Sequence, residues 1–105
     1  MKLITKEIEK EIEKKPLYFY EENDIDTKDA KIIVKFFGGG QWTWWAIEGE
    51  KLEDGDIRFF GLVQGFEKEF GYFTLRELED LKFPPFGLGI ERDKYFSNKT
   101  IKDVI

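Results

Sequence analysis

The sequence predicts an α+β fold: a single domain in which about four strands form a mostly antiparallel meander sheet, packed with an N-terminal helix and a helix following Thr74. Residues 31–48 contain two runs rich in β-branched and aromatic side chains, joined by three glycines at 38–40, as in two adjacent strands. The length of 105 residues suits one domain, and a 41% hydrophobic content supports a folded core. Short connections between successive strands favour antiparallel pairing.

The N-terminal helix is expected over residues 3–15. Its apolar residues recur at helical spacing and form one stripe: Leu3, Ile4, Ile8 and Ile12. Thr5 or a neighbour caps the start, and Pro16 ends the helix because the residue before a proline disfavours helical geometry.

An acidic loop, with room for one helical turn, follows at 21–29, before the four strands expected at residues 31–37, 41–48, 57–64 and 69–74. Alternation places Ile32, Val34 and Phe36 on one face of the first strand. Since both faces of that strand are largely apolar, we expect it to be central and covered on both sides. A short strand near 94–96 and a helical turn within 99–105 complete the chain.

The second helix has the clearest start signal. Thr74 and Glu77 fit a capping box, in which each side chain accepts a backbone N–H at the helix start, and Pro84 and Pro85 follow the end. We expect both helices to cover the same face of the sheet. The predicted core consists of Ile8, Ile12, Ile32, Val34, Phe36, Trp44, Phe59, Leu62, Tyr72, Leu75, Leu78 and Leu81.

Composition excludes several chemistries. The chain has no cysteine and no histidine, so it offers no disulfide, no thiolate, and neither the commonest zinc ligand nor the commonest general base. Its formal net charge of −5 repels phosphate backbones, so we do not expect nucleic acid as a partner. The start lacks a signal-peptide core, and no apolar run approaches the ~18 residues of a membrane span. We therefore expect a cytoplasmic protein without membrane contact, and the oligomeric state stays open.

Cofactor motifs fail when they are tested residue by residue. The glycines at 38–40 lack the Gly-Lys-Ser/Thr of a phosphate loop, and Arg92 stands where a dinucleotide fingerprint beginning at Gly87 needs glycine. A calcium loop centred on Gly55 would place Leu52 and Gly61 at ligand positions. We expect no cofactor and no metal.

Paired carboxylates could still perform acid–base chemistry without histidine. The candidates lie beside aromatic residues and are Glu48, Asp56, Glu69 and Glu91. A carboxylate-based hydrolase is therefore an alternative, although we do not expect an enzyme.

Two acidic loops, 21–29 and 48–56, each hold five carboxylates against one lysine. If the meander brings them to one end of the sheet, they form one negative surface for a basic protein partner. The other interpretation is that they are solvated turns. The residues assigned to this protein-binding surface are Glu21, Glu22, Asp24, Asp26, Glu50, Glu53, Asp54 and Asp56.

The tryptophans suggest another ligand face. Trp42 and Trp44 share one side of their strand, and Lys35 and Arg58 are the basic residues near the middle of the sheet. Exposed aromatics of this kind stack on single-stranded bases or sugar rings. Packing of all three indoles in the core is the competing and favoured interpretation.

Several motifs together resemble a known family. They are Val34-Lys-Phe-Phe, Trp42-Thr-Trp-Trp, Glu48-Gly, Phe59-Phe-Gly, Gly71-Tyr-Phe-Thr-Leu-Arg-Glu-Leu-Glu79 and Gly89-Ile-Glu-Arg-Asp-Lys-Tyr-Phe96, with the opening Leu3-Ile-Thr-Lys-Glu. The chain resembles the DUF2958 family, a small bacterial family of unknown function that is frequent on plasmids, phages and other mobile elements. The resemblance implies a non-catalytic accessory protein of a mobile genetic element, with no catalytic residues to assign. By analogy with small acidic proteins of such elements, inhibition of a host DNA-processing or defence enzyme is one expectation.

Overall fold

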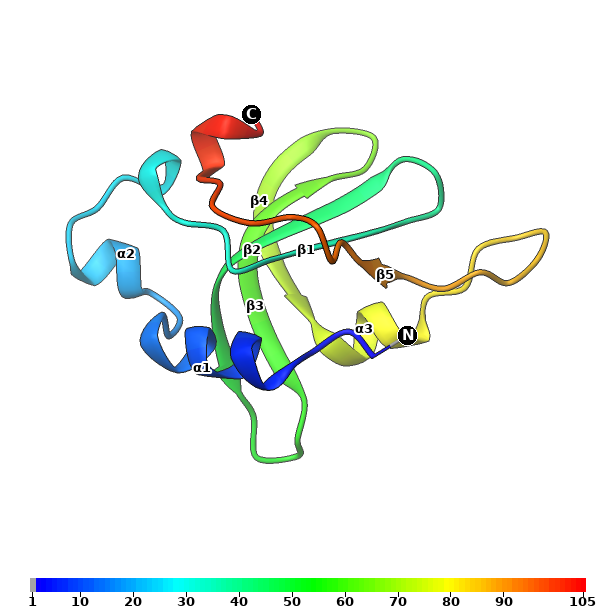
Figure 1. The fold of residues 1–105 in the computed structure, drawn as a ribbon, viewed down its shortest axis with the longest axis horizontal. Coiled ribbons are helices and arrows are strands. Elements are labelled where there is room, and N and C mark those ends of the chain that lie inside the picture. Colours follow the sequence, from blue (N-terminus) through cyan, green and yellow to red (C-terminus); the bar gives the residue numbers. More distant parts are fainter. Residues whose placement is uncertain (1) are drawn as a thin grey trace.

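The fold is built on one antiparallel sheet of five strands (Figure 1). The computed structural model describes residues 2–105. The strands are β1 (Val34–Gly38), β2 (Trp42–Lys51), β3 (Ile57–Gln64), β4 (Lys68–Thr74) and β5 (Glu91–Arg92). Their spatial order is β4-β3-β2-β1-β5, so β1 to β4 form the predicted meander in sequence order. The α+β class is confirmed, and β5 adds a short fifth strand beside β1.

β1 begins later than predicted. Residues 31–33 are not part of the strand: Lys31 and Ile32 pair with the C-terminal part of the chain, where the Ile32 N–H donates to the Lys99 carbonyl at 2.9 Å, and the Ile33 N–H donates to Ala46 of β2. Ile32 therefore packs in a different core from Val34 and Phe36. The prediction that these three side chains share one face of the strand was wrong for Ile32. The predicted central position of the strand is confirmed, because β1 lies between β2 and β5. The predicted cover on both faces was wrong, since Phe37 is exposed and Lys35 only half-buried.

β2 and β3 form the longest pairing of the sheet. β2 runs to Lys51, three residues beyond the predicted end, and a bulge lies between Ala46 and Glu48. The predicted alternation along β2 is confirmed, since Trp44 and Ala46 belong to one core and Trp45 to the other. At the β1–β2 turn, Gly39 and Gly40 adopt φ values of +63° and +78°, which glycine tolerates without strain.

The helices are short. The two predicted ones are α1 (Lys6–Lys14) and α3 (Leu75–Asp80), and α2 (Phe19–Glu22), η1 (Thr27–Asp29) and η2 (Ile101–Asp103) lie in the connecting segments. Thr5 caps α1 by accepting the Ile8 N–H, and Thr74 caps α3 by accepting the Glu77 N–H, each at 3.2 Å. The Glu77 carboxylate accepts the Thr74 hydroxyl rather than its backbone N–H, so half of the predicted capping box forms.

Two apolar cores lie on opposite faces of the sheet. The first, beneath α1 and α3 as predicted, contains Leu3, Ile4, Ile12, Val34, Phe36, Trp44, Ala46, Ile57, Phe59, Phe73, Leu78 and Ile90. The second, covered by the α2–η1 segment and η2, contains Tyr20, Ala30, Ile32, Trp45, Ile47, Leu62 and Ile101.

Most of the predicted core residues are buried, but four are not. Tyr72 and Leu81 are 52% and 36% exposed, so their assignment to the core was wrong. Ile8 and Leu75 are half-buried and pack against the rim of the first core. The strand predicted near 94–96 is also absent, since β5 lies at Glu91–Arg92. Within residues 2–105, no helix has the length and apolar character needed to cross a membrane.

Candidate functional site

Glu48 fixes the position of α2 on the sheet. Its side chain is buried (4% exposed), although a carboxylate is costly to bury without partners. Oε1 accepts the Tyr18 N–H at 3.0 Å and Oε2 accepts the Tyr20 N–H at 2.9 Å. These bonds join β2 to the start of α2, where Tyr18 adopts a left-handed conformation with φ of 71°. The result is a fixed platform from which the Tyr18 side chain remains half exposed.

Tyr18 lies beside a group of aromatic side chains on the outer strand of the sheet. Phe70 and Tyr72 alternate with Gly71 along β4 and point to the same side, opposite Leu62 and Phe60 of β3. The Phe60 ring stacks on Phe70 with centroids 5.8 Å apart and lies 5.0 Å from the Tyr72 ring. We call Tyr18, Phe60, Phe70 and Tyr72 the aromatic edge.

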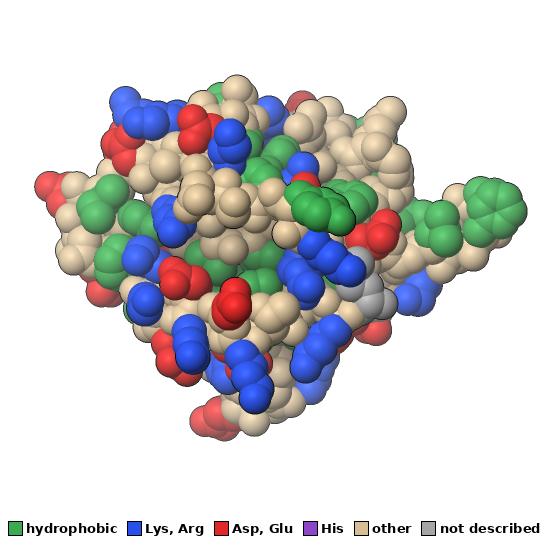
Figure 2. Space-filling model, viewed as in Figure 1, with side chains coloured by type: hydrophobic (Ala, Val, Ile, Leu, Met, Phe, Trp, Pro, Cys, Tyr) green, Lys and Arg blue, Asp and Glu red, His purple; other side chains and the backbone are tan. Residues whose placement is uncertain are grey.

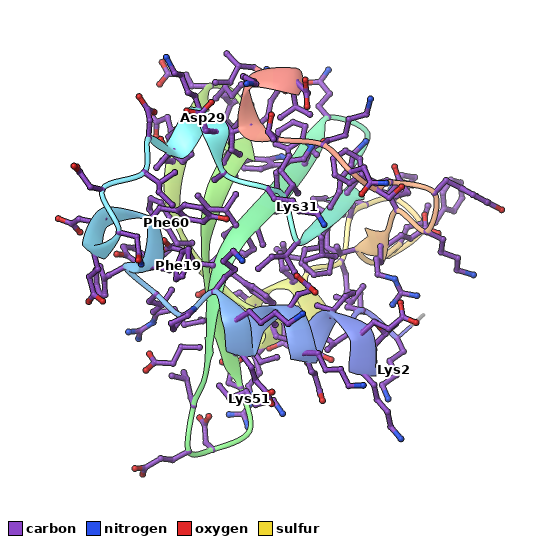
Figure 3. The ribbon with its side chains drawn as sticks, turned by 60° about the vertical axis from the view of Figure 1, so that its left-hand side comes forward. Lys2, Phe19, Asp29, Lys31, Lys51 and Phe60 are labelled. Atoms are coloured by element: carbon purple, nitrogen blue, oxygen red, sulfur yellow. The ribbon has the colours of Figure 1, made fainter. Side chains whose placement is uncertain are left out.

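The aromatic edge is open to solvent. Tyr18, Phe70 and Tyr72 are 50%, 40% and 52% exposed, whereas most large apolar side chains of the sheet are buried. Contiguous exposed aromatics on a structured surface mark interaction sites more often than isolated ones do. Figure 3 shows Phe19 of α2 and Phe60 of β3 next to one another on this flank, and both pack against the second core.

Carboxylates lie on the α2 side of this surface, whereas Arg58 and Lys68 share its face of the sheet. A hydrogen bond with the Tyr18 side chain raises the pKa of Tyr72, and burial, the Tyr18 charge, Glu48 and Glu21 raise it further. Burial also raises the pKa of Tyr20, which lies beneath in the second core, and the Glu48 carboxylate adds to that effect. Glu21 and Glu22 of α2 are exposed. The aromatic edge therefore has an acidic border on its α2 side.

The predicted acidic surface is only partly formed. Glu21, Glu22, Asp24 and Asp26 are exposed on the α2–η1 segment, although Asp26 also accepts the Lys28 N–H at 3.0 Å. The β2–β3 hairpin carries Glu50, Glu53 and Asp54 at a separate corner of the molecule, away from α2 (Figures 1 and 3). The two loops therefore do not merge into one negative surface.

Asp56 was assigned to that surface, but it is buried. Its Oδ1 accepts the Ile57 N–H at 2.7 Å and the Arg76 N–H at 3.0 Å, which ties the hairpin to the start of α3. Asp54 is exposed but forms an ion pair with Arg76 at 3.0 Å. Both side chains stabilise the local structure.

The predicted aromatic ligand face does not form. Trp44 is buried, and Trp42 stacks on it with centroids 5.9 Å apart. In the strand register, Lys35 stands opposite Trp45 and Arg58 stands opposite Glu50. Both basic side chains therefore lie on the other face of the sheet from Trp44. Trp42 and Trp44 consequently have no basic partners of the kind proposed, and the competing core interpretation is correct for Trp44 and Trp45.

Sequence reasoning missed the aromatic edge. The available signal was the alternation of Phe70 and Tyr72 in the last strand of the predicted meander. The last strand of a meander has one unpaired edge, so aromatic side chains on it are more exposed than those of inner strands. Among residues 2–105, no group of three or more acidic side chains is placed to hold a metal ion.

Comparison with known proteins identifies the family but no activity. The family model described as "Protein of unknown function (DUF2958)" matches residues 3–102, and the chain belongs to this family. No curated protein and no solved structure matches the chain.

Proposed function

We propose that this chain is a non-catalytic accessory protein that binds a basic surface of another protein through the aromatic edge and the acidic residues of the α2–η1 segment. The observation that carries the proposal is the cluster of half-exposed aromatic side chains beside exposed carboxylates on a fixed platform. As part of the same proposal we place the protein in the cytoplasm and in the service of a mobile genetic element. A host DNA-processing or defence enzyme is the expected partner, because the nucleic-acid grooves of such enzymes are positively charged.

The composition of the surface supports a protein ligand. Protein interfaces have an aromatic-rich centre that carries most of the affinity and a polar rim that excludes water. Tyr18, Phe70 and Tyr72 match such a centre, and two of them carry hydroxyls that can hydrogen-bond when buried. The platform limits the entropy lost on binding because Glu48 already fixes the backbone of Tyr18.

The acidic border supports a basic partner. Glu21, Glu22, Asp24 and Asp26 stand close together in sequence with Lys28 as the nearest compensating charge. Charges at the rim of an interface act mainly on the rate of association and on selectivity, and salt screens them. The proposal therefore assigns the affinity to the aromatic edge and the choice of partner to the carboxylates.

Affinity capture with variant baits tests the proposal. The purified chain is immobilised and exposed to lysate of the cells that carry its gene, at low and at high salt, and bound proteins are quantified by mass spectrometry. One bait carries Phe70→Ser and Tyr72→Ser; another carries Glu21→Gln, Glu22→Gln and Asp24→Asn. We expect one partner with a basic surface to be lost, by at least about tenfold, from the first bait at both salt concentrations. The second bait should capture less of that partner at low salt, with a smaller difference at high salt.

A matched bait controls for net charge. It carries Glu13→Gln, Glu67→Gln and Glu79→Gln, which remove three exposed carboxylates elsewhere. This bait should retain the partner. If all three baits retain it, or if the control loses it equally, the aromatic edge and α2 are not the docking surface.

A further inference from the structure

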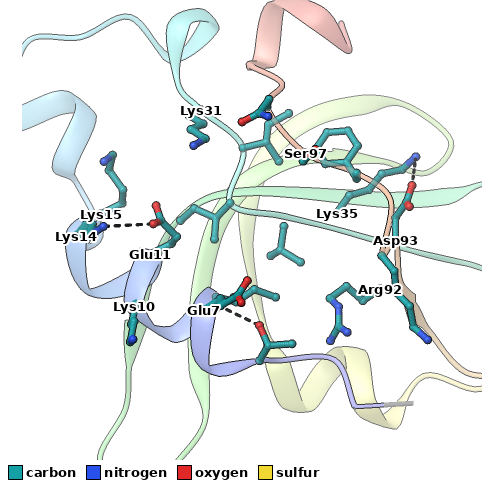
Figure 4. A pocket seen from close by; sticks show the side chains of 18 residues that line it. Glu7, Lys10, Glu11, Lys14, Lys15, Lys31, Lys35, Arg92, Asp93 and Ser97 are labelled. Carbon is teal, nitrogen blue, oxygen red and sulfur yellow. Dashed lines mark hydrogen bonds and ion pairs between the residues drawn. The ribbon is translucent and has the colours of Figure 1, made fainter.

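A basic cleft lies on the molecule, apart from the aromatic edge. It has a volume of about 670 Å³ and lies between α1, the 31–35 segment and residues 92–98. Figure 2 shows Lys and Arg side chains gathered around a hollow on this face. Figure 4 shows α1 on one side of the cleft and residues 92–98 on the other, with Lys35 reaching Asp93 on that second side and Lys31 near the end of α1.

The charge of the cleft is opposite to that of the chain. Seven of its lining residues are basic and three are acidic, which gives a formal charge of +4 in a chain whose formal charge is −5. The basic residues are Lys10, Lys14, Lys15, Lys31, Lys35, Arg92 and Lys94, and the acidic ones are Glu7, Glu11 and Asp93. Salt screens charges more than ~10 Å away at ~0.1 M, so a ligand in the cleft is governed by the local excess.

The three acids are already counted in the charge of +4, and their ion pairs leave several lysines of the cleft unpaired among the residues that the structure describes. Glu11 pairs with Lys14 at 3.4 Å on the exposed surface of α1, and such pairs are weak enough to exchange partners. Asp93 pairs with Lys35 at 3.4 Å. Lys10, Lys31 and Lys94 form no ion pair with any residue from 2 to 105.

The kind of cation indicates the kind of anion. Six of the seven basic residues are lysines, which act on phosphates as point charges without a required geometry. The arginine fork suits carboxylates and phosphates alike, and Nη1 of Arg92 already donates to the Lys2 carbonyl at 2.7 Å. The free cations of the cleft are therefore lysines, which suit phosphates as point charges.

The shape of the cleft indicates an extended ligand. Cations line both walls, and Lys10 and Lys14 stand one helical turn apart along α1, so positive charge repeats along the cleft. Partly exposed Ile33 and Phe96 contribute apolar surface between the walls. Grooves that combine repeated cations with apolar or aromatic contacts are typical of proteins that bind single-stranded nucleic acid without sequence preference.

We propose that this cleft binds the phosphodiester backbone of a short stretch of single-stranded nucleic acid. The lysines of α1 and Lys31 contact successive phosphates, and sugars or bases lie against Ile33 and Phe96. This site is independent of the protein-binding surface, because no residue of the aromatic edge lines the cleft.

The test measures the fluorescence anisotropy of labelled oligothymidylate with the full chain at several salt concentrations. The variant Lys10→Gln, Lys14→Gln, Lys31→Gln removes three exposed cations of the cleft. We expect its Kd to rise at least about tenfold at ~50 mM salt. The slope of log affinity against log salt should become shallower by about two, which corresponds to three lost phosphate contacts on a single strand.

The matched control is Lys6→Gln, Lys28→Gln, Lys82→Gln, three exposed lysines that do not line the cleft. It should bind the oligonucleotide like the unaltered chain, and thermal melting should show that both variants are folded. The proposal is overturned if no binding occurs up to ~200 µM chain at low salt, or if the two triple variants lose affinity equally. It is also overturned if a duplex of equal length or polyglutamate binds as tightly as the single strand.

Discussion

Glu48 is the residue on which the position of α2 depends. Its two oxygens accept the N–H groups of Tyr18 and Tyr20 inside the protein. Substitution Glu48→Gln leaves one acceptor and places an NH₂ group against a backbone N–H. We expect the free energy of unfolding to fall by about 1–3 kcal/mol, the cost of unpaired buried polar groups. Urea denaturation measures the change.

The control for this substitution is Glu50→Gln, two residues further along the same strand at an exposed position. We expect a change within about 0.5 kcal/mol, as is usual for exposed surface positions. Equal stability of the two variants would contradict the anchoring role of Glu48.

The sequence alone did not reveal what Glu48 does. It stands beside aromatic residues and was considered there as a catalytic acid, but its partners are N–H groups 28 and 30 positions earlier in the chain. No local pattern encodes such a contact. The same applies to Asp56, whose acidic neighbours suggested an exposed turn, although its Oδ1 accepts the N–H of Arg76 20 residues later.

Among the secondary structure elements, β2 and β3 pair so closely that one glycine has no room for a side chain. A Cβ on Gly61 would clash with the Trp45 carbonyl and the Ala46 backbone, next to the β2 bulge. We expect Gly61→Ala to lower the free energy of unfolding by more than about 2 kcal/mol, because backbone atoms must move. Thermal and urea unfolding report the loss.

Gly71, the residue paired with Gly61 on β4, provides the comparison. A Cβ there meets nothing within 4 Å. Gly71→Ala should be neutral or stabilising by up to about 1 kcal/mol, since glycine weakens a strand interior. A Gly61→Ala protein as stable as Gly71→Ala would contradict the close pairing of β2 with β3.

The central elements could be predicted because their signals are local. Alternation in β3 and the Thr74 cap of α3 each lie within a few residues, and both were placed correctly. β5 has only two residues and depends on pairing with Phe36 and Phe37, so it has no periodicity to detect. Ile32 was assigned to the wrong face because a hydrogen bond to Lys99 ends the strand pattern there.

For the whole molecule, total charge was a poor guide to local charge. The formal charge of −5 argued against any phosphate ligand, yet the basic cleft carries +4, which leaves −9 on the rest of the chain. α1 contributes two lysines to the cleft and Lys15 follows its end, and residues 31–35 and 92–98 supply the other basic residues. Only the tertiary fold brings these three segments together, so sequence could supply the residues but not their grouping.

The central claim is that the aromatic edge and α2 form the surface that binds a protein partner. Hydrogen–deuterium exchange of the chain, alone and in complex with the captured partner, tests it most directly. Amides in residues 18–22 and 68–74 should exchange more slowly in the complex, because α2 and the outer strand become covered, while residues 52–56 and 84–88 should be unchanged. Slower exchange confined to residues outside 18–22 and 68–74 would contradict the claim.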